Sequence, residues 1–393
     1  MKPARQALHF QARGRALLQR GFSLVELLVA VVIGMLLTVA ITGLMVRSEA
    51  GRRALSNVND VSMNGAFLSY TLDRTLRSAG SGYSQSWRVA YGCRLLAARS
   101  GTQVLPRTAA FPAPFASVPQ TVRMAPLVIH AGIGTGSSDV LAVMTGASAL
   151  GELPVPVLAG SVTGTLLRLP ATVGLRASDL VVVLQDQSNC IVQQVTSPFT
   201  GGATQDLNFG GTYAASTINS VNLSSLGVST PALVAPIGNL SGNQPNFQLL
   251  GLGANATLFT FDMLRLDGGT TATAIADGVL DLRARYGIDS NDDGRVDAWV
   301  SPATAPWTAA ALTDGSTTAR DNLARILAVR VGLVLRNNTP ERSDVSPSSL
   351  TLFGDLDPTL QVTRTLSAAD RLLRLRTLEF TVPLRNVMLK PAA

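Results

Sequence analysis

The sequence predicts an α+β fold, in which a long N-terminal helix packs on a mainly antiparallel β-sheet body with long loops. Three observations predict it. Segment 22–46 carries no charge other than Glu26, the apolar positions from 54 to 79 recur at three- and four-residue steps, and those after Tyr83 alternate with polar positions. A helical period followed by a strand period favours one helix joined to a β-rich body.

The positive charge of the chain is concentrated at its start. The formal net charge is +7, and five of the 32 Lys and Arg residues lie before Gly21, where there is no Asp or Glu. A chain that begins at Phe22 keeps 27 basic residues against 25 acidic ones, a net charge of +2. We therefore interpret residues 1–21 as a targeting leader, and the charge does not predict a nucleic-acid-binding surface.

The apolar segment 22–46 is long enough to cross a membrane as a helix. Basic residues lie on both sides, and the positive-inside rule predicts a cytoplasmic leader and an exported body. A secretory signal peptide would have a shorter apolar core, followed by a small-residue cleavage site. Glu26 raises a question, because an ionised carboxylate in hydrocarbon costs roughly 2.5 kcal/mol or more.

The helix is predicted to continue beyond the membrane segment. One apolar stripe is formed by Ala54, Val58, Val61, Leu68, Leu72, Leu76 and Ala79. The sequence SAGSGYS at 78–84 ends the helical pattern. The predicted helical region is therefore 22–80, half in the membrane and half packed on the body at 81–393.

Alternating segments predict the strands of the body. Segment 179–196 reads as two strands joined by a turn at 186–189, and further strands are predicted within 258–266, 282–288, 327–335 and 378–384. The region at about 196–245 is rich in Gly, Ser, Thr, Asn and Pro and almost uncharged. It is predicted to be a loop-rich excursion that is either exposed or locally disordered.

Cys93 and Cys190 are the only two cysteines. In an exported body such a pair is a candidate disulfide, which would close a loop of about 97 residues and contribute roughly 4 to 5 kcal/mol in the chain-entropy model. Two buried free thiols are the alternative.

The sequence DSNDDGRVD at 289–297 is a candidate calcium loop. Oxygen ligands at Asp289, Asn291 and Asp293, the Arg295 carbonyl and Asp297 match the first nine positions of an EF-hand loop. Position twelve is Val300 and not the usual Glu, so the candidate Ca²⁺ site is incomplete. The alternative is an acidic turn held by its own Asx hydrogen bonds.

Catalysis is the function class that the sequence favours least. The chain has two histidines, and no Ser/His/Asp, Cys/His or paired-carboxylate arrangement is evident. The glycines of 132–136 lack the spacing of a phosphate loop and predict a turn, with His130 as a loop residue. The basic run RLLRLR at 371–376 has no interleaved aromatic residues, so it predicts the start of a strand and no specific nucleic-acid site.

The stretch RGFSLVE at 20–26 resembles the type IV prepilin motif. The resemblance implies that a prepilin peptidase cuts after Gly21 and methylates the new terminal amine of Phe22. It also implies that Glu26 pairs with the terminal amine of a neighbouring subunit, which neutralises the buried carboxylate. The alternative is a plain signal anchor whose Glu26 reaches the membrane interface.

Further stretches are similar to PilW-like minor pilins of type IV pili. They are LDRTLRSAGSGY at 72–83, YGC at 91–93, DGVLDLRARYGIDSNDDGRVDAW at 277–299, LAVRVGLVLRN at 327–337 and RTLEFTVPLRN at 376–386. This resemblance implies a low-abundance subunit that primes pilus assembly and sits at the tip, supporting attachment, twitching motility or DNA uptake.

The implied partners are the prepilin peptidase, other minor pilins, the major pilin and the pilus assembly machinery. The implied location is the inner membrane of a Gram-negative bacterium with a periplasmic body, and later the extracellular pilus. Two alternatives remain: a type II secretion pseudopilin, and a pilus-tip adhesin that binds through the excursion at 196–245.

Overall fold

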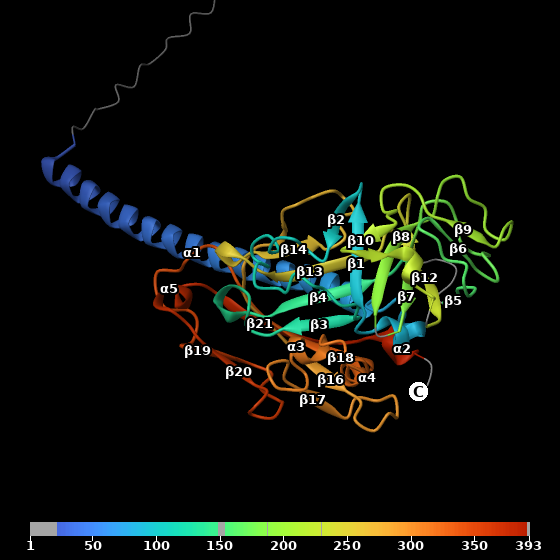
Figure 1. The fold of residues 1–393 in the computed structure, drawn as a ribbon. Helices are drawn as coiled ribbons and strands as arrows, with labels where there is room; N and C mark the ends of the chain where they lie inside the picture. Colours follow the sequence, from blue (N-terminus) through green and yellow to red (C-terminus); the bar gives the residue numbers. More distant parts are fainter. Residues whose placement is uncertain (1–21, 148–153, 187, 229, 391–393) are drawn as a thin grey trace, which may run out of the picture. The chain divides into compact units, whose positions relative to one another are not determined.

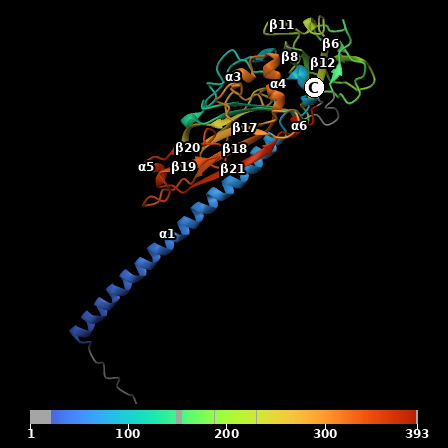
Figure 2. The same ribbon diagram turned by 90° about the horizontal axis from the view of Figure 1, so that it is seen from below.

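The computed structural model of the chain describes residues 22–147, 154–186, 188–228 and 230–390. The chain separates into two compact units, with the division between Ser56 and Asn57. One helix, α1 (Leu24–Arg77, 54 residues), contains this division (Figures 1 and 2). The helical region predicted at 22–80 is therefore confirmed, and α1 begins two residues after its start and ends three residues before its end.

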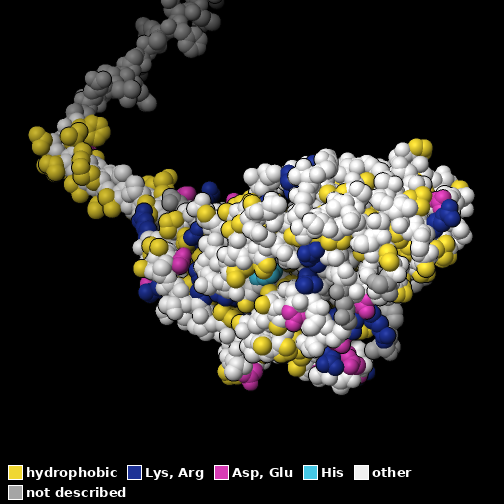
Figure 3. Space-filling view, in the orientation of Figure 1, with side chains coloured by type: hydrophobic (Ala, Val, Ile, Leu, Met, Phe, Trp, Pro, Cys, Tyr) yellow, Lys and Arg dark blue, Asp and Glu magenta, His cyan; other side chains and the backbone are white. Residues whose placement is uncertain are grey.

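In the first unit, α1 exposes a continuous apolar surface. The span Leu24–Val46 contains 23 residues and meets the length and composition criteria for a membrane helix. Its large hydrophobic side chains are all exposed, and Figure 3 shows them gathered along the start of the helix. No proline interrupts this part of the helix.

In the second unit, α1 buries one side. Val61, Leu68, Leu72, Leu76 and Ala79 are at most 4% exposed, as the apolar stripe predicts. Val58 was predicted to belong to this stripe, but it is 46% exposed. The adjacent Asn57 is buried instead, and its side-chain amide donates to the carboxylate of Glu341.

A six-stranded sheet has the order β2-β1-β8-β7-β12-β5. β1 and β8 are parallel, and the other neighbours are antiparallel. Its strands are β1 (Arg94–Arg99), β2 (Thr102–Leu105), β5 (Val155–Pro156), β7 (Asp179–Gln185), β8 (Asn189–Gln194) and β12 (Ala232–Asn239). β7 and β8 confirm the two strands predicted within 179–196.

Both faces of this sheet are covered. Val182 and Leu184 of β7 belong to the main hydrophobic core, whereas Val181 and Val183 belong to a second core with Leu207. All seven residues of β7 are buried. A strand buried on both faces reads as a continuous apolar run, which explains the sequence LVVVL.

Two further sheets are entirely antiparallel. The order in the five-stranded sheet is β15-β14-β13-β4-β3, and in the four-stranded sheet it is β17-β16-β18-β21. The strands of the first are β3 (Leu127–His130), β4 (Val140–Thr145), β13 (Asn246–Leu252), β14 (Leu258–Asp262) and β15 (Thr273–Ala276). The strands of the second are β16 (Val279–Ile288), β17 (Ala298–Val300), β18 (Ile326–Arg336) and β21 (Leu375–Pro383). They confirm the strands predicted within 258–266, 282–288, 327–335 and 378–384.

Short elements complete the body. Two-stranded sheets pair β6 (Leu166–Arg168) with β9 (Asp206–Asn208), β10 (Thr217–Ile218) with β11 (Val221–Asn222), and β19 (Ser349–Leu352) with β20 (Val362–Thr365). The helices are α2 (Trp87–Ala90), α3 (Ala309–Leu312), α4 (Thr317–Arg325), α5 (Ala368–Arg371) and α6 (Arg385–Met388). The 3₁₀ turns are η1 (Ser84–Ser86), η2 (Thr135–Ser137), η3 (Leu223–Ser225) and η4 (Ala254–Ala256).

The structure corrects the prediction for about 196–245. The segment is rich in turns, but it also supplies β9, β10, β11 and β12, and Leu223 and Leu226 are buried. β12 pairs with β7 along most of its length. The interpretation as an exposed or locally disordered excursion is therefore wrong for β12, whose Pro236 and Gly238 obscured the strand pattern.

Candidate functional site

The start of α1 carries the residues predicted to act in assembly. Gly21 lies outside the described residues, and Phe22 is 82% exposed. The backbone N–H of Glu26 donates to the Ser23 hydroxyl at 3.1 Å, so Ser23 caps the helix. The exposed Glu26 lies in the first turn, where the positive end of the helix dipole favours a carboxylate.

Further along the apolar segment, two hydroxyl groups are satisfied within the helix. Thr38 donates to the Gly34 carbonyl at 2.6 Å, and Thr42 donates to the Thr38 carbonyl at 2.8 Å. Polar groups in hydrocarbon require such internal partners. Glu26 is therefore the one charged side chain between Leu24 and Val46 that needs an external partner.

Cys93 and Cys190 form a disulfide, which confirms the predicted pairing. Their Cα atoms are 5.8 Å apart, and both residues are buried. Cys190 lies opposite Leu95 in the parallel pairing of β1 with β8, and Cys93 lies just before β1. The bridge therefore ties together two strands that lie 97 residues apart in the sequence.

The candidate calcium residues lie in the loop between β16 and β17. Asp289 accepts hydrogen bonds from the backbone N–H groups of Asp293, at 3.2 Å, and Gly294, at 2.7 Å. In the same way, the Asn291 side chain accepts from the Asp293 N–H group, and the Asp293 side chain accepts from the Arg295 N–H group. The loop thus has the Asx hydrogen bonds of the alternative interpretation, and these bonds leave further oxygen lone pairs free.

Asp297 turns toward Ser290. Its carboxylate accepts from both the N–H and the hydroxyl of Ser290 at 2.8 Å, and these bonds lower the pKa of Asp297. Within the described residues, no group of three or more His, Cys, Asp or Glu side chains is arranged to hold a metal ion. A calcium ion here would therefore need Asn291, the Arg295 carbonyl and water among its ligands.

Calcium binding remains a prediction, and it has a direct test. For a site of about 1 mM affinity, 10 mM Ca²⁺ would stabilise the protein by about 1.4 kcal/mol and raise the melting temperature by a few degrees. Asp293→Ala should abolish this rise. The matched control is Asp357→Ala, which removes a similar carboxylate that accepts from the Thr359 N–H in an exposed turn. Equal melting temperatures in calcium and in chelator would remove the metal site.

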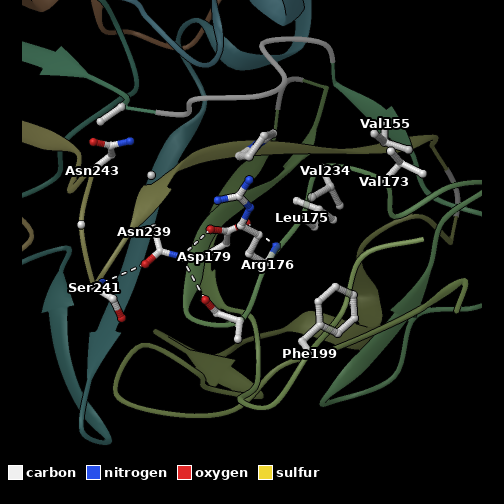
Figure 4. Close-up of a pocket in the computed structure, with 16 residues that line it drawn as sticks. Val155, Val173, Leu175, Arg176, Asp179, Phe199, Val234, Asn239, Ser241 and Asn243 are labelled. Atoms are coloured by element: carbon white, nitrogen blue, oxygen red, sulfur yellow. Dashed lines mark hydrogen bonds between the residues drawn. The ribbon is translucent and has the colours of Figure 1, made fainter. Parts of the chain in front are cut away.

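A cavity of about 550 Å³ lies beside β12 (Figure 4). Val155, Leu175, Phe199 and Val234 supply apolar walls, and the turn at 238–243 supplies polar groups. The side chain of Arg176 extends into the space, and its guanidinium has no hydrogen-bond partner among the described residues. The cavity therefore offers an apolar surface beside a positive charge, which also acts on the nearby Asp179 carboxylate.

The polar side of the cavity is held in place by Asp179. Asn239 donates its amide to this carboxylate at 2.7 Å, and the Arg176 N–H donates to it at 2.6 Å. Burial raises the pKa of Asp179, and these two bonds act in the opposite direction. The arrangement suits binding of a ligand and contains no nucleophile paired with a base.

The other predicted features have structural roles. The glycine-rich stretch forms the turn between β3 and β4, as predicted. His130 was predicted to lie in a loop, but it ends β3 and is half-buried, and burial lowers its pKa to about 4. In the basic run, Arg371 pairs with Asp344 and Arg374 with Glu341, so both arginines serve the fold at the start of β21.

Sequence reasoning missed two features of these sites. Ser23 at the N-cap, three residues before Glu26, has the spacing of a capping box, and this signal was available in the sequence. The cavity was not predictable in the same way. Its lining comes from segments around 155, 175, 199 and 240 that only the folded sheet brings together.

Two family models match the chain. The model described as Prokaryotic N-terminal methylation motif matches residues 17–42, and the model described as Type IV Pilus-assembly protein W matches residues 251–386. The second match contains the whole four-stranded sheet, whereas the whole six-stranded sheet lies outside it. No curated protein and no solved structure matches the chain.

Proposed function

We propose that this chain, which its two family matches identify as a PilW-like prepilin-type protein, is a minor pilin that primes type IV pilus assembly and sits at the pilus tip. One observation carries the proposal. The methylation motif includes the start of a 54-residue helix, and the pilus-assembly match lies in the folded body of the same chain. Such a subunit supports attachment, twitching motility or DNA uptake.

The proposed sequence of events begins at the membrane. The leader directs insertion, and the prepilin peptidase cleaves after Gly21 and methylates the amine of Phe22. The body is then periplasmic, and the helix holds the protein in the inner membrane of a Gram-negative cell. The apolar surface of Leu24–Val46 subsequently packs against other minor pilins and the major pilin, which replace lipid around it.

Within this assembly Glu26 sets the position of the subunit. A carboxylate among apolar helices needs a positive partner, and the terminal amine of a neighbouring subunit provides one. The Ser23 cap and the helix dipole stabilise the first turn, so the carboxylate is presented from an ordered helix end. A subunit one turn out of place would leave both charges unpaired.

A deletion tests the proposal against its main alternative, a type II secretion pseudopilin. Cells that lack this chain should lose surface pili and twitching motility and should secrete folded exoproteins at the normal level. Expression of the intact chain from a plasmid should restore pili. Normal piliation together with a loss of exoprotein secretion would instead assign the chain to the secretion system.

A role as a tip adhesin is the second candidate, and the cavity beside β12 favours it. This cavity lies outside the part of the chain that matches the pilus-assembly model, and Arg176 gives it a positive charge. Its expected ligand is an acidic glycan with an apolar face. In a glycan-binding assay, Arg176→Ala should lose binding, and Arg168→Ala, an exposed arginine paired with Asp206, is the matched control.

A further inference from the structure

The edge strand β21 differs from the other edges of the three larger sheets. Those edges, β2, β3, β5, β15 and β17, are two to four residues long. β21 has nine residues and pairs with β18 without a register shift. Short or interrupted edges prevent unwanted strand pairing, and β21 has neither form of protection.

The backbone groups of β21 alternate between its two sides. Leu384 donates to the Leu327 carbonyl at one end of the ladder, and Asn337 donates to the Arg374 carbonyl at the other. The two-residue period of an antiparallel ladder then directs the backbone groups of every even-numbered residue from 376 to 382 toward β18. The backbone groups of the odd-numbered residues face outward.

The outward residues of the strand are Leu375, Thr377, Glu379, Thr381 and Pro383. The Leu375 N–H donates to the Ser346 hydroxyl at 3.2 Å, and Pro383 has no N–H, which leaves Thr377, Glu379 and Thr381. Their three N–H and three C=O groups have no hydrogen-bond partner among the described residues, and Thr377 and Thr381 are exposed. Unpaired groups of this kind form a template for another strand. Residues 377 and 381 are four steps of an extended strand apart, or about 13 Å, so five residues of an added strand would lie along this stretch.

The charged side chains of β21 are not placed to prevent strand pairing at this edge. Glu379 accepts from Arg330 at 2.9 Å and from the Phe353 N–H at 2.8 Å. Arg376 donates to the Ser62 hydroxyl of α1 at 3.1 Å. Both side chains are thus engaged in the fold, and β21 contains no lysine. Pro383, which lacks an N–H, limits pairing only at the end of the strand.

The side chains on the two faces of β21 determine what kind of segment can pair with its outer edge. Leu378 and Phe380 face α1 and are half-buried, whereas Thr377 and Thr381 face the opposite side. Leu378 packs beside Gly65 of α1. An added strand would therefore place apolar side chains beside Leu378 and Phe380 and polar ones beside the threonines.

The second unit also has an exposed apolar stripe on α1. Met63, Phe67 and Tyr70 are 72%, 49% and 66% exposed, at the i, i+4 and i+7 spacing of one helix side. At about 100° per residue they lie roughly 140° to 200° around the helix from Gly65, which faces Leu378, so this stripe is separate from the surface beside β21. A partner with an alternating apolar and polar segment would satisfy the backbone groups of the edge and pack beside Leu378 and Phe380.

We propose that the outer edge of β21 accepts an extended segment of another pilus subunit as an added strand along Thr377–Thr381. The proposal rests on the proposed function for the identity of the partner. The hydrogen-bonding pattern of β21 requires an extended segment, and the alternation of its faces requires an amphipathic one. A helix would leave the three N–H groups of the edge unpaired.

Amide hydrogen exchange tests the edge directly. The full-length chain is coexpressed singly with each prepilin-type protein of the same bacterium, and the complexes are purified in detergent. In the chain alone, the amides of Thr377, Glu379 and Thr381 should exchange quickly. In the complex that uses the edge, their exchange should slow by about tenfold or more. Exchange of these three amides as in the free chain in every one of these complexes would overturn the proposal.

Substitutions give a second measurement. Thr377→Pro with Thr381→Pro removes two outward N–H groups, and Pro383 already occupies an equivalent outward position. The double variant should reduce co-purification of the partner about thirtyfold, because it loses two strand hydrogen bonds that each contribute about 1 kcal/mol. The matched control, Thr377→Val with Thr381→Val, keeps both N–H groups and should bind normally. If the proline variant melts at a lower temperature, its weaker binding can result from a destabilised fold. The exchange measurement on the unmodified chain is then the test of the proposal.

The outcomes separate this inference from the proposed function. If deletion abolishes pili but the edge amides are unprotected in every complex, the chain is still a minor pilin, and the proposed strand addition at β21 is wrong. Normal piliation on deletion would overturn the proposed function. Protection of the three amides in the chain alone, with a doubled particle mass, would show that a second copy occupies the edge and would contradict a heterologous partner.

Discussion

Glu26→Ala is expected to leave cleavage after Gly21 largely intact and to remove the chain from assembled pili. The substitution lies outside the cleaved bond, but it leaves the terminal amine of the neighbouring subunit without its carboxylate. Breaking a buried ion pair by removing one partner costs about 3 to 5 kcal/mol, which corresponds to a hundredfold or larger loss in association. The measurement is the amount of this chain in sheared pili, relative to the processed chain in membranes.

Two variants make the Glu26 result specific. Glu26→Asp keeps a carboxylate on the same turn and should restore part of the incorporation. Asp60→Ala removes an exposed carboxylate from the same helix and should be incorporated normally. Normal amounts of the Glu26→Ala chain in sheared pili would remove Glu26 from the assembly mechanism and leave the plain signal anchor as the better interpretation of the segment.

Replacing both cysteines is expected to have the largest effect on stability. Cys93→Ser with Cys190→Ser opens a loop of 97 residues and should lower the free energy of unfolding by roughly 4 to 5 kcal/mol. For a body of this size, the melting temperature should fall by about 6 to 8 °C. The physical reason is the larger conformational freedom of the unfolded chain, together with weaker registration of β1 against β8.

Thermal unfolding of the full-length protein in detergent measures this effect. Cys93→Ala with Cys190→Ala is the matched control, because it removes the bridge without adding buried hydroxyl groups, which carry their own cost. Both double variants should melt far below the unmodified protein, and the serine variant should melt lowest. A fall of less than about 2 °C in the alanine variant would contradict a stabilising role of the disulfide.

The long helix and the antiparallel strands were predictable because, in each of them, the apolar side chains that face the core recur with a regular period. Leu68, Leu72 and Leu76 recur with the helical period and are all buried. The four-stranded sheet likewise shows a strand period in β16, β18 and β21. Local periodicity is a strong signal when one side of an element is buried and the other is not.

The six-stranded sheet was harder to predict because its pairings are not local. β1 pairs in parallel with β8, about 95 residues later, and no sequence period indicates this neighbour. β12 contains Pro236 and Gly238, which normally argue against an interior strand. The structure accommodates Pro236 because β5 pairs with β12 only at Leu233 and Val234, so β5 does not require an N–H group from the proline.

The candidate sites also divide into those that the sequence predicts and those that depend on the folded structure. The disulfide followed from two cysteines in an exported body, and the structure confirms it. The candidate calcium loop was predicted from spacing alone, but spacing does not show where carboxylates turn, and Asp297 faces Ser290. The free edge of β21 depends on which strands lie beside it, so it was visible only after the sheet order was known.

The N-terminal mass of the protein from cells with and without the prepilin peptidase shows whether the leader is removed. We predict a chain that begins at methylated Phe22 when the peptidase is present and an intact leader when it is absent. An intact leader in both strains would contradict this prediction, because the chain would then be a membrane-anchored body with no free amine for a neighbouring Glu26.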